Sequence, residues 1–175
     1  MNDFLTASEL NEVGTIPDSL LGTIKEFEAT DLSAVGPNRG RLHGRKIVAM
    51  AVKNESGGTL SAGQIVLHST STEGVGEGVG AATSAAAVAE GVVPWCITGT
   101  IADDANFWLI KKGYCKFLSD GGNDVAAGAL VQPAASGRVS AHTAGTNDIY
   151  CCGKMIEAIG AVADAKVAGI ADFKF

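Results

Sequence analysis

The sequence predicts a mainly β protein, in which a small barrel-like or sandwich-like β domain follows an extended N-terminal arm. Apolar residues make up 46% of the 175 residues and charged residues 18%, a balance that builds a core rather than a disordered chain. Glycine occurs 23 times, among many Ala, Val and Thr residues, which is typical of short strands joined by tight turns. Few windows hold the 3.6-residue period of an amphipathic helix.

Short apolar runs between turn residues predict the strands of a compact domain that spans residues 42–175. A Gly-rich loop is expected at residues 71–80, and a hairpin that turns at Gly113 is expected within residues 106–119. Strands at this spacing are typical of a small barrel or sandwich. The predicted strands are residues 46–54, 64–70, 91–101, 106–113, 114–119, 129–134, 137–142, 149–159 and 166–175.

Two internal similarities predict a repeated β unit. Residues 56–66 and 120–131 both contain a Gly-Gly turn, an aliphatic residue, an Ala-Gly pair and a strand, and the Ala-Gly pairs lie 65 residues apart. Residues 97–117 and 158–175 share an Ala-Asp turn between two strands, with the Ala-Asp pairs 61 residues apart. Similar offsets indicate a pseudo-repeat, although chance similarity in an Ala- and Gly-rich chain is the alternative.

Residues 1–41 differ from the rest and predict an arm. Pro17 and Pro37 interrupt any long element, and residues 18–27 are expected to form a short helix. The apolar residues come singly and are too few to build a core of their own, so we expect them to need a partner surface. A flexible terminus is the alternative. The apolar residues taken as contacts to a partner are Phe4, Leu5, Leu10, Ile16, Leu20, Leu21, Ile24 and Phe27.

Charge is segregated along the first third of the chain. Residues 1–35 hold seven acids and one lysine, whereas residues 36–53 hold five basic residues and no acid. This pattern favours contact by charge complementarity, and Arg39, Arg41 and Arg45 join the predicted contact residues. The whole chain carries a net charge of −6, which argues against nucleic acid as a partner.

Residue patterns for catalysis, metal binding or cofactor binding are weak. The cysteines at positions 96, 115, 151 and 152 form no CxxC pair, so we expect buried, reduced thiols rather than a zinc site. Residues 76–81 match the spacing G-x-G-x-x-A, but no βαβ pattern continues from them, and a surface loop is expected there. We expect no enzyme activity, no cofactor and no metal. Neither a signal peptide nor a transmembrane span is predicted, which points to synthesis in the cytoplasm.

The chain from about residue 46 to residue 175 resembles the capsid decoration, or head cement, proteins of tailed bacteriophages. The resemblance rests on an AVKN strand, a GGxLxAG turn, a QIV strand and a second segment that typically contains AAGD, LV, P and GR. Ala129 stands where an acid is common. The matching residues of the second segment are Ala126, Ala127, Gly128, Leu130, Val131, Pro133, Gly137 and Arg138.

The resemblance implies a structural protein of the virion that binds the outer capsid surface and stabilises the head. It further implies the major capsid protein as partner, a homotrimer, and no membrane partner. Many weak contacts made together can raise avidity without a strong single contact. The alternative is a β-rich module of a virion that binds carbohydrate or a receptor. Such a module should expose clustered aromatic residues, whereas Trp95 and Trp108 lie within aliphatic strands and are expected in the core.

Overall fold

The computed structural model describes residues 9–28, 46–69, 78–81, 88–122, 124–145 and 150–173, and strands predominate among them. The mainly β fold class is therefore confirmed. In the part of the chain that is described, helical structure consists of short 3₁₀ turns, and no helix has the length and apolarity needed to cross a membrane.

Five strands close into a ring that we call the N-terminal barrel. β2 (Lys46–Asn54) pairs in parallel with β5 (Gly78–Ala81), and antiparallel pairs then link β5 to β4 (Ile65–His68), β4 to β6 (Ala89–Val92) and β6 to β8 (Asn106–Leu118). β8 returns to β2 through an antiparallel ladder, which closes the ring. Closure leaves no unpaired edge between these five strands.

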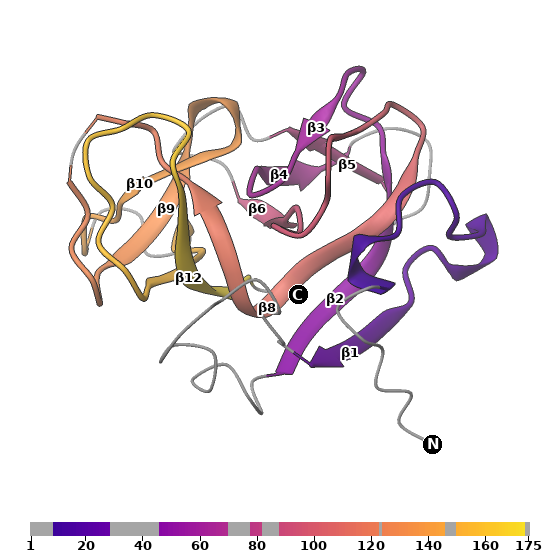
Figure 1. Ribbon diagram of the computed structural model, residues 1–175, viewed down its shortest axis with the longest axis horizontal. Coiled ribbons are helices and arrows are strands. Elements are labelled where there is room, and N and C mark those ends of the chain that lie inside the picture. Colours follow the sequence, from indigo (N-terminus) through magenta and orange to yellow (C-terminus); the bar gives the residue numbers. More distant parts are fainter. Residues whose placement is uncertain are drawn as a thin grey trace.

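A second ring, the C-terminal barrel, uses the far half of β8. Antiparallel pairs run from β8 to β12 (Lys166–Asp172), to β11 (Gly153–Met155), to β9 (Leu130–Ala134) and to β10 (Arg138–Ala141). A parallel bridge between Val139 in β10 and Ser119, directly after β8, closes this ring. Figure 1 shows the two barrels side by side, with β8 running through both.

Equivalent backbone hydrogen bonds confirm the predicted repeat. The N–H of Asp104 donates to the carbonyl of Asn54 at 2.8 Å, and the N–H of Asp164 donates to the carbonyl of Ser119 at 3.0 Å. Both aspartates have positive φ, 62° and 60°, a conformation that Asp tolerates better than most residues. Positions 54 and 119 are 65 apart, as predicted, but positions 104 and 164 are 60 apart. The Ala-Asp pairs themselves lie 61 apart, so the structural equivalence of these turns is shifted by one residue from the alignment of the pairs.

The two Ala-Gly turns are also equivalent in backbone conformation and hydrogen bonding. Gly63 and Gly128 have φ of 85° and 86°, and their N–H groups donate to the carbonyls of Val93 and Met155, each at 2.9 Å. Each turn leads into a strand that forms its barrel, β4 in one case and β9 in the other. A short strand pair, β3 (Leu60–Ser61) with β7 (Thr100–Ile101), precedes the first turn, and a single bridge between Val125 and Ile159 takes its place before the second.

The expected hairpin at Gly113 is wrong, because β8 passes through this residue as one strand of 13 residues. Gly113 has φ of 103°, and a Cβ added there would lie 2.3 Å from the carbonyl oxygen of Lys46. Glycine therefore lets β2 approach closely where β8 crosses from one barrel to the other. Gly113, which predicted a turn, lies instead where β8 passes from the N-terminal barrel to the C-terminal barrel.

Four further expectations differ from the structure. The predicted strand at residues 149–159 is reduced to β11 (Gly153–Met155). Residues 18–27 form no helix but a 3₁₀ turn, η2 (Asp18–Leu20), and strand β1 (Ile24–Glu28). Residues 91–101 are not one strand, since β6 ends at Val92 and β7 begins at Thr100. Of the expected Gly-rich loop, Gly78 to Gly80 belong to β5, because Val79 is wholly buried in the N-terminal barrel; residues 71–77 lie outside the described residues.

The core forms two clusters, divided by the alternation of side chains along β2 and β8. Met50, Val52, Phe107 and Leu109 point into the N-terminal barrel. Their neighbours on the same strands face outward into the other cluster, which also fills the C-terminal barrel. These neighbours are Ile47, Ala49, Ala51, Trp108 and Ile110. The outer face of β2 and β8 is thus apolar and needs a cover.

Candidate functional site

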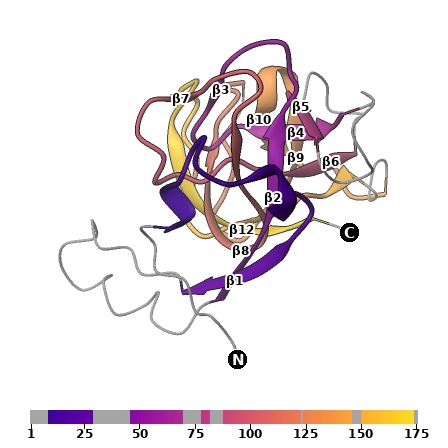
Figure 2. The same cartoon turned by 90° about the vertical axis from the view of Figure 1, so that its right-hand side faces the viewer.

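The described part of the arm covers the outer face of β2 and β8. β1 pairs antiparallel with β2 and places Ile24 opposite Met50, and Figure 2 shows it along the side of the sheet. The N–H of Gly22 donates to the carbonyl of Ala51 at 2.8 Å, and the N–H of Ala51 donates to the carbonyl of Thr23 at 3.0 Å. The arm is therefore joined to the domain by backbone as well as by side chains.

The sequence of β1 explains its two faces. In the run IKEFE, Lys25 and Phe27 point toward the domain, while Ile24 and Glu26 point away, because successive side chains on a strand alternate. Phe27 is wholly buried and Ile24 is 51% exposed. Glu26 forms an exposed ion pair with Lys46 at 2.7 Å. Charge on an outermost strand is a common protection against unwanted edge pairing.

The predicted contact residues fall into three groups. Leu10, Ile16 and Phe27 are buried on the domain of the same chain. Leu20 and Leu21 are half-buried, and Ile24 is exposed. The described arm therefore packs onto its own domain, in contrast to the extended arm that was expected, because the outer face of β2 and β8 offers the apolar surface it needs. The remaining residues lie outside the described residues: Phe4, Leu5, Arg39, Arg41 and Arg45.

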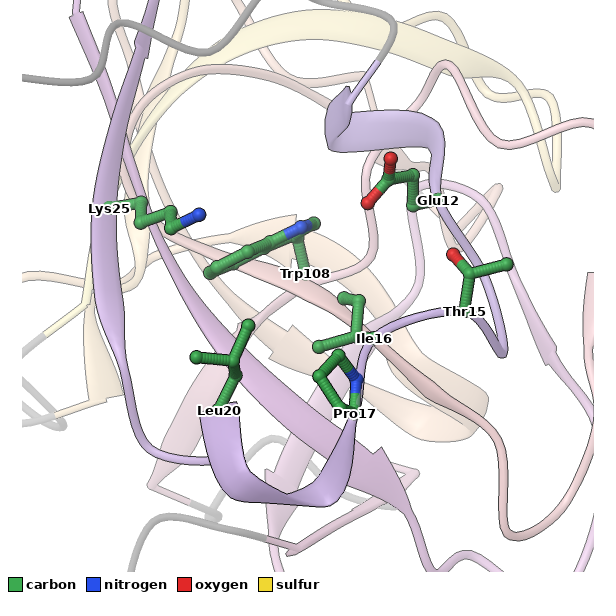
Figure 3. Close-up of a pocket in the computed structure, with 7 residues that line it drawn as sticks. All are labelled: Glu12, Thr15, Ile16, Pro17, Leu20, Lys25 and Trp108. Carbon is green, nitrogen blue, oxygen red and sulfur yellow. The ribbon is translucent and has the colours of Figure 1, made fainter.

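A pocket of about 100 Å³, which we call the indole pocket, lies between the arm and β8. Figure 3 shows Lys25 and Glu12 reaching in from opposite sides of the Trp108 indole. Glu12, Thr15 and Pro17 are exposed, so the pocket opens to solvent. Its lining residues are Glu12, Thr15, Ile16, Pro17, Leu20, Lys25 and Trp108.

Trp108 is buried against Phe27 but its polar atom is unmatched. The indole is 2% exposed, and the Phe27 ring meets it edge-on with a centroid separation of 5.3 Å. The Nζ of Lys25 lies 5.2 Å from the indole centroid, within the range of a cation–π interaction. Among the described residues, the buried indole Nε1 has no hydrogen-bond acceptor, which is uncommon for a buried donor.

Asn106 fixes the segment of the arm that lines the indole pocket. Its side-chain Nδ2 donates to the carbonyl of Ile16 at 2.9 Å and to the carboxylate of Asp18 at 2.7 Å. Its backbone carbonyl accepts from the N–H of Gly14 at 2.8 Å. The arm residues of the pocket are therefore positioned by the strand that carries Trp108. No sequence pattern indicates this site, because an Asn and a Trp two residues apart match no recognisable motif.

A second hollow of about 360 Å³ lies where the two barrels meet. Arg138 binds Asp164 through two hydrogen bonds, at 2.8 and 3.0 Å, and this pairing lowers the pKa of the Asp164 carboxyl. Gln64 donates to the carbonyl of Ser136 at 3.0 Å. The Arg138–Asp164 pair lies within the C-terminal barrel, whereas the hydrogen bond from Gln64 to Ser136 joins the two barrels.

The four cysteines are free thiols. Cys115 and Cys152 are buried, and burial raises the pKa of both thiols. Burial also raises the pKa of Cys96 to about 11. A raised pKa keeps the thiol protonated and a poor nucleophile. The expectation of buried thiols is confirmed for Cys115 and Cys152, whereas Cys96 and Cys151 are only half-buried. Within the described ranges, no group of three or more His, Cys, Asp or Glu residues is placed to hold a metal ion.

Comparison with known proteins identifies a similarity of fold. No protein-family model matches the chain, and no curated protein has a matching sequence. Among solved structures, the fold resembles that of the N base of the head fiber gp8.5 in bacteriophage phi29, with a TM-score of 0.51 and 10% sequence identity. The match covers 74% of this chain and 99% of that chain. At this identity, the similarity concerns the fold alone.

Proposed function

We propose that this chain is a structural protein of a tailed-phage virion that binds the outer surface of the capsid and stabilises the head. The observation that carries the proposal is the fold shared with the base of a phage head fiber, whose full length is matched. The decoration-protein pattern of the sequence points to the same class of virion protein by an independent route. Function is inferred here from fold-level analogy.

The architecture suits a protein that binds its partner through a large contact surface. Two closed barrels share β8 and the arm is hydrogen-bonded to β2, so the molecule presents a rigid outer surface. A rigid surface loses little conformational entropy on binding, and repeated attachment across a lattice raises avidity. We propose a homotrimer on the capsid exterior, with the major capsid protein as partner and with no catalytic role.

Co-sedimentation with intact capsids tests this proposal. Capsids of the phage that encodes the chain, stripped of it and incubated with the full chain, should bind it saturably, with one trimer per threefold or quasi-threefold position. Bound capsids should resist heating or low ionic strength better than bare ones. If the chain stays in the supernatant at every ratio, capsid decoration is wrong even though the fold is unchanged.

The contribution of the basic residues can be tested in the same assay. Replacing Arg39, Arg41 and Arg45 together by Gln should weaken capsid binding and reduce its dependence on salt, because salt screens the attraction between opposite charges on two proteins. Replacing Lys112, Lys154 and Lys166, which are exposed on the C-terminal barrel, makes a control of equal charge. Equal weakening by both sets would contradict a specific role for the arm.

The alternative, a carbohydrate- or receptor-binding module, has less support in the described part of the chain. Trp108 is buried and Tyr114 is 4% exposed. Trp95 is half-buried and meets Tyr114 edge-on, with ring centroids 4.9 Å apart. These rings are used for packing, whereas a sugar platform needs an exposed face.

A further inference from the structure

The connection between β1 and β2 is much longer than the pairing of these strands needs. Glu28, the last residue of β1, lies opposite Lys46, the first residue of β2, so a tight hairpin suffices to join them. Instead, residues 29–45 lie between them, a connection of 17 residues. In the same chain, the antiparallel strands β9 and β10 are joined by only the three residues Ala135–Gly137. Hairpin connections are commonly about two to five residues long.

This length works against docking of the arm on its own domain. Closing a longer loop costs more conformational entropy, and the register of β1 on β2 does not require the extra residues. A connection of 17 residues can instead extend to about 55 Å, which is enough to carry the arm to a neighbouring molecule. Connections of this length are uncommon within compact domains and usually have a function or act as linkers.

The described contacts of the arm come from the arm segment itself. In the single chain β1 lies along β2 (Figure 2) and pairs with it over its whole length, and Phe27 is wholly buried against Trp108. Asn106 donates to the carbonyl of Ile16 and to the carboxylate of Asp18. The same contacts form whichever copy of the chain supplies the arm, because exchange of an identical element alters only the covalent connection.

The outer face of β2 and β8 matches the sequence of this arm. The Nζ of Lys25 lies 5.2 Å from the Trp108 ring centroid. Glu26 forms an ion pair with Lys46 at 2.7 Å, and Phe27 is wholly buried. A strand from a different protein would have to match this order of charge and bulk, whereas the arm of another copy carries it. A second copy of this chain is therefore the occupant that fits.

We propose that, in the homotrimer, each arm docks on the outer face of β2 and β8 of the neighbouring copy, so that exchanged arms hold the trimer together. This inference rests on the homotrimer of the proposed function. The ring closes because each copy gives one arm and receives one. A subunit then leaves only after two arms have been withdrawn, its own and the one it receives, each with its buried Phe27.

A disulfide between β1 and β2 shows which copy supplies the arm. Glu26 lies opposite Val48, and Glu26 is exposed while Val48 is half-buried, so cysteines at both positions leave the core intact. The N–H of Ala51 donates to the carbonyl of Thr23. The alternation along an antiparallel ladder therefore makes 26 and 48 a non-hydrogen-bonded pair, in which opposite side chains lie close together.

The full chain carrying Glu26→Cys and Val48→Cys is oxidised and run on a denaturing, non-reducing gel. We expect covalent dimers and trimers, with the linkage between positions 26 and 48 identified by mass spectrometry. Each single variant controls for the four native cysteines, since neither can form this linkage. A native trimer that gives only monomer on the gel, with the linkage inside one chain, would overturn the exchange.

A shortened connection gives a second test that needs no disulfide. Deleting residues 32–44 leaves four residues between β1 and β2, enough for a hairpin but too few to reach another copy. The native mass measured by light scattering should fall about threefold, from trimer to monomer. Replacing the same residues by a Gly/Ser segment of equal length is the matched control and should preserve the trimer. A shortened chain that remains a trimer would contradict the exchange.

Co-sedimentation with capsids distinguishes failure of this inference from failure of the proposed function. A chain that trimerises with each arm on its own domain and still decorates capsids refutes only the exchange. A chain whose arms link different copies but that never binds capsids supports the exchange and refutes only the proposed function.

Discussion

Replacing Phe27 by Ala should destabilise the protein substantially, because the arm is part of the folded domain. The Phe27 ring is wholly buried and packs edge-on against Trp108. Truncation of a buried Phe to Ala typically costs about 3–5 kcal/mol, including the cavity left behind. The aromatic pair accounts for about 0.5–1.5 kcal/mol of such a loss. We therefore expect the free energy of unfolding to fall by about 3–5 kcal/mol.

Urea denaturation followed by tryptophan fluorescence measures this loss, because Trp108 lies under Phe27. The midpoint should move to lower urea with little change in slope, and the melting temperature should drop by about 2–4 °C for each kcal/mol. Ile24→Ala is the matched control, since Ile24 lies on the same strand and is 51% exposed. It should cost less than about 1 kcal/mol.

The arm limits the size of this effect. If undocking of the arm costs less free energy than the cavity left by Phe27→Ala, the arm of the variant detaches. The measured loss of stability then equals the free energy of docking the arm, and the amide hydrogens of β1 exchange before those of the rest of the fold. Equal small losses for Phe27→Ala and Ile24→Ala, with β1 amides unprotected in the unaltered protein, would refute the packing of the arm on β2 and β8.

Three further predictions concern the barrels. Gly153→Ala should destabilise by about 1–3 kcal/mol through overpacking, because a Cβ there would lie 2.4 Å from the carbonyl oxygen of Ile170. Gly160→Ala, with nothing within 4 Å, should change urea stability by less than about 0.5 kcal/mol, and the reverse order would contradict the close approach of β11 to β12. Burial raises the pKa of Cys96 from 9.0 to about 11, so the folded state holds its proton longer than the unfolded chain, and stability should fall as pH rises from 9 to 11. Cys96→Ala should flatten that pH dependence, and an unchanged slope would exclude Cys96 as its source. Iodoacetamide should modify Cys115 only after urea unfolds the chain, because the thiol is buried and its pKa is raised; mass spectrometry showing rapid modification of the native protein would disprove its burial.

Local signals in the sequence predicted the elements whose cause is local. The run KIVAMAVKN predicted β2 with its observed bounds, residues 46–54, because β-branched and apolar residues end there at a turn. The two Ala-Gly pairs predicted the repeat, because only a residue that tolerates positive φ fits those turns. Proline and scattered apolar residues separated the arm from the domain, although they did not reveal where the arm docks.

The candidate site was beyond the reach of sequence patterns. Glu12, Lys25 and Trp108 come from three segments, and the pocket exists only where the arm lies on β8. Phe27 was predicted as a contact of a partner-binding arm, since an apolar side chain on an arm fits an intermolecular surface as well as an intramolecular one. Burial alone distinguishes the two cases, and burial depends on the full fold.

The sequence by itself determined the mainly β character, the boundaries of several strands and the tandem repeat, since each follows from residues that are neighbours in the chain. Tertiary structure decided the ring closures, because the parallel pairing of β2 with β5 and of Ser119 with Val139 joins segments that no local pattern connects. It also decided that β8 continues through Gly113. This glycine does not form a turn; its lack of a Cβ leaves room for the backbone carbonyl of Lys46. The arm follows the same rule: its apolar residues required a cover, and the outer face of β2 and β8 on the same chain provides it.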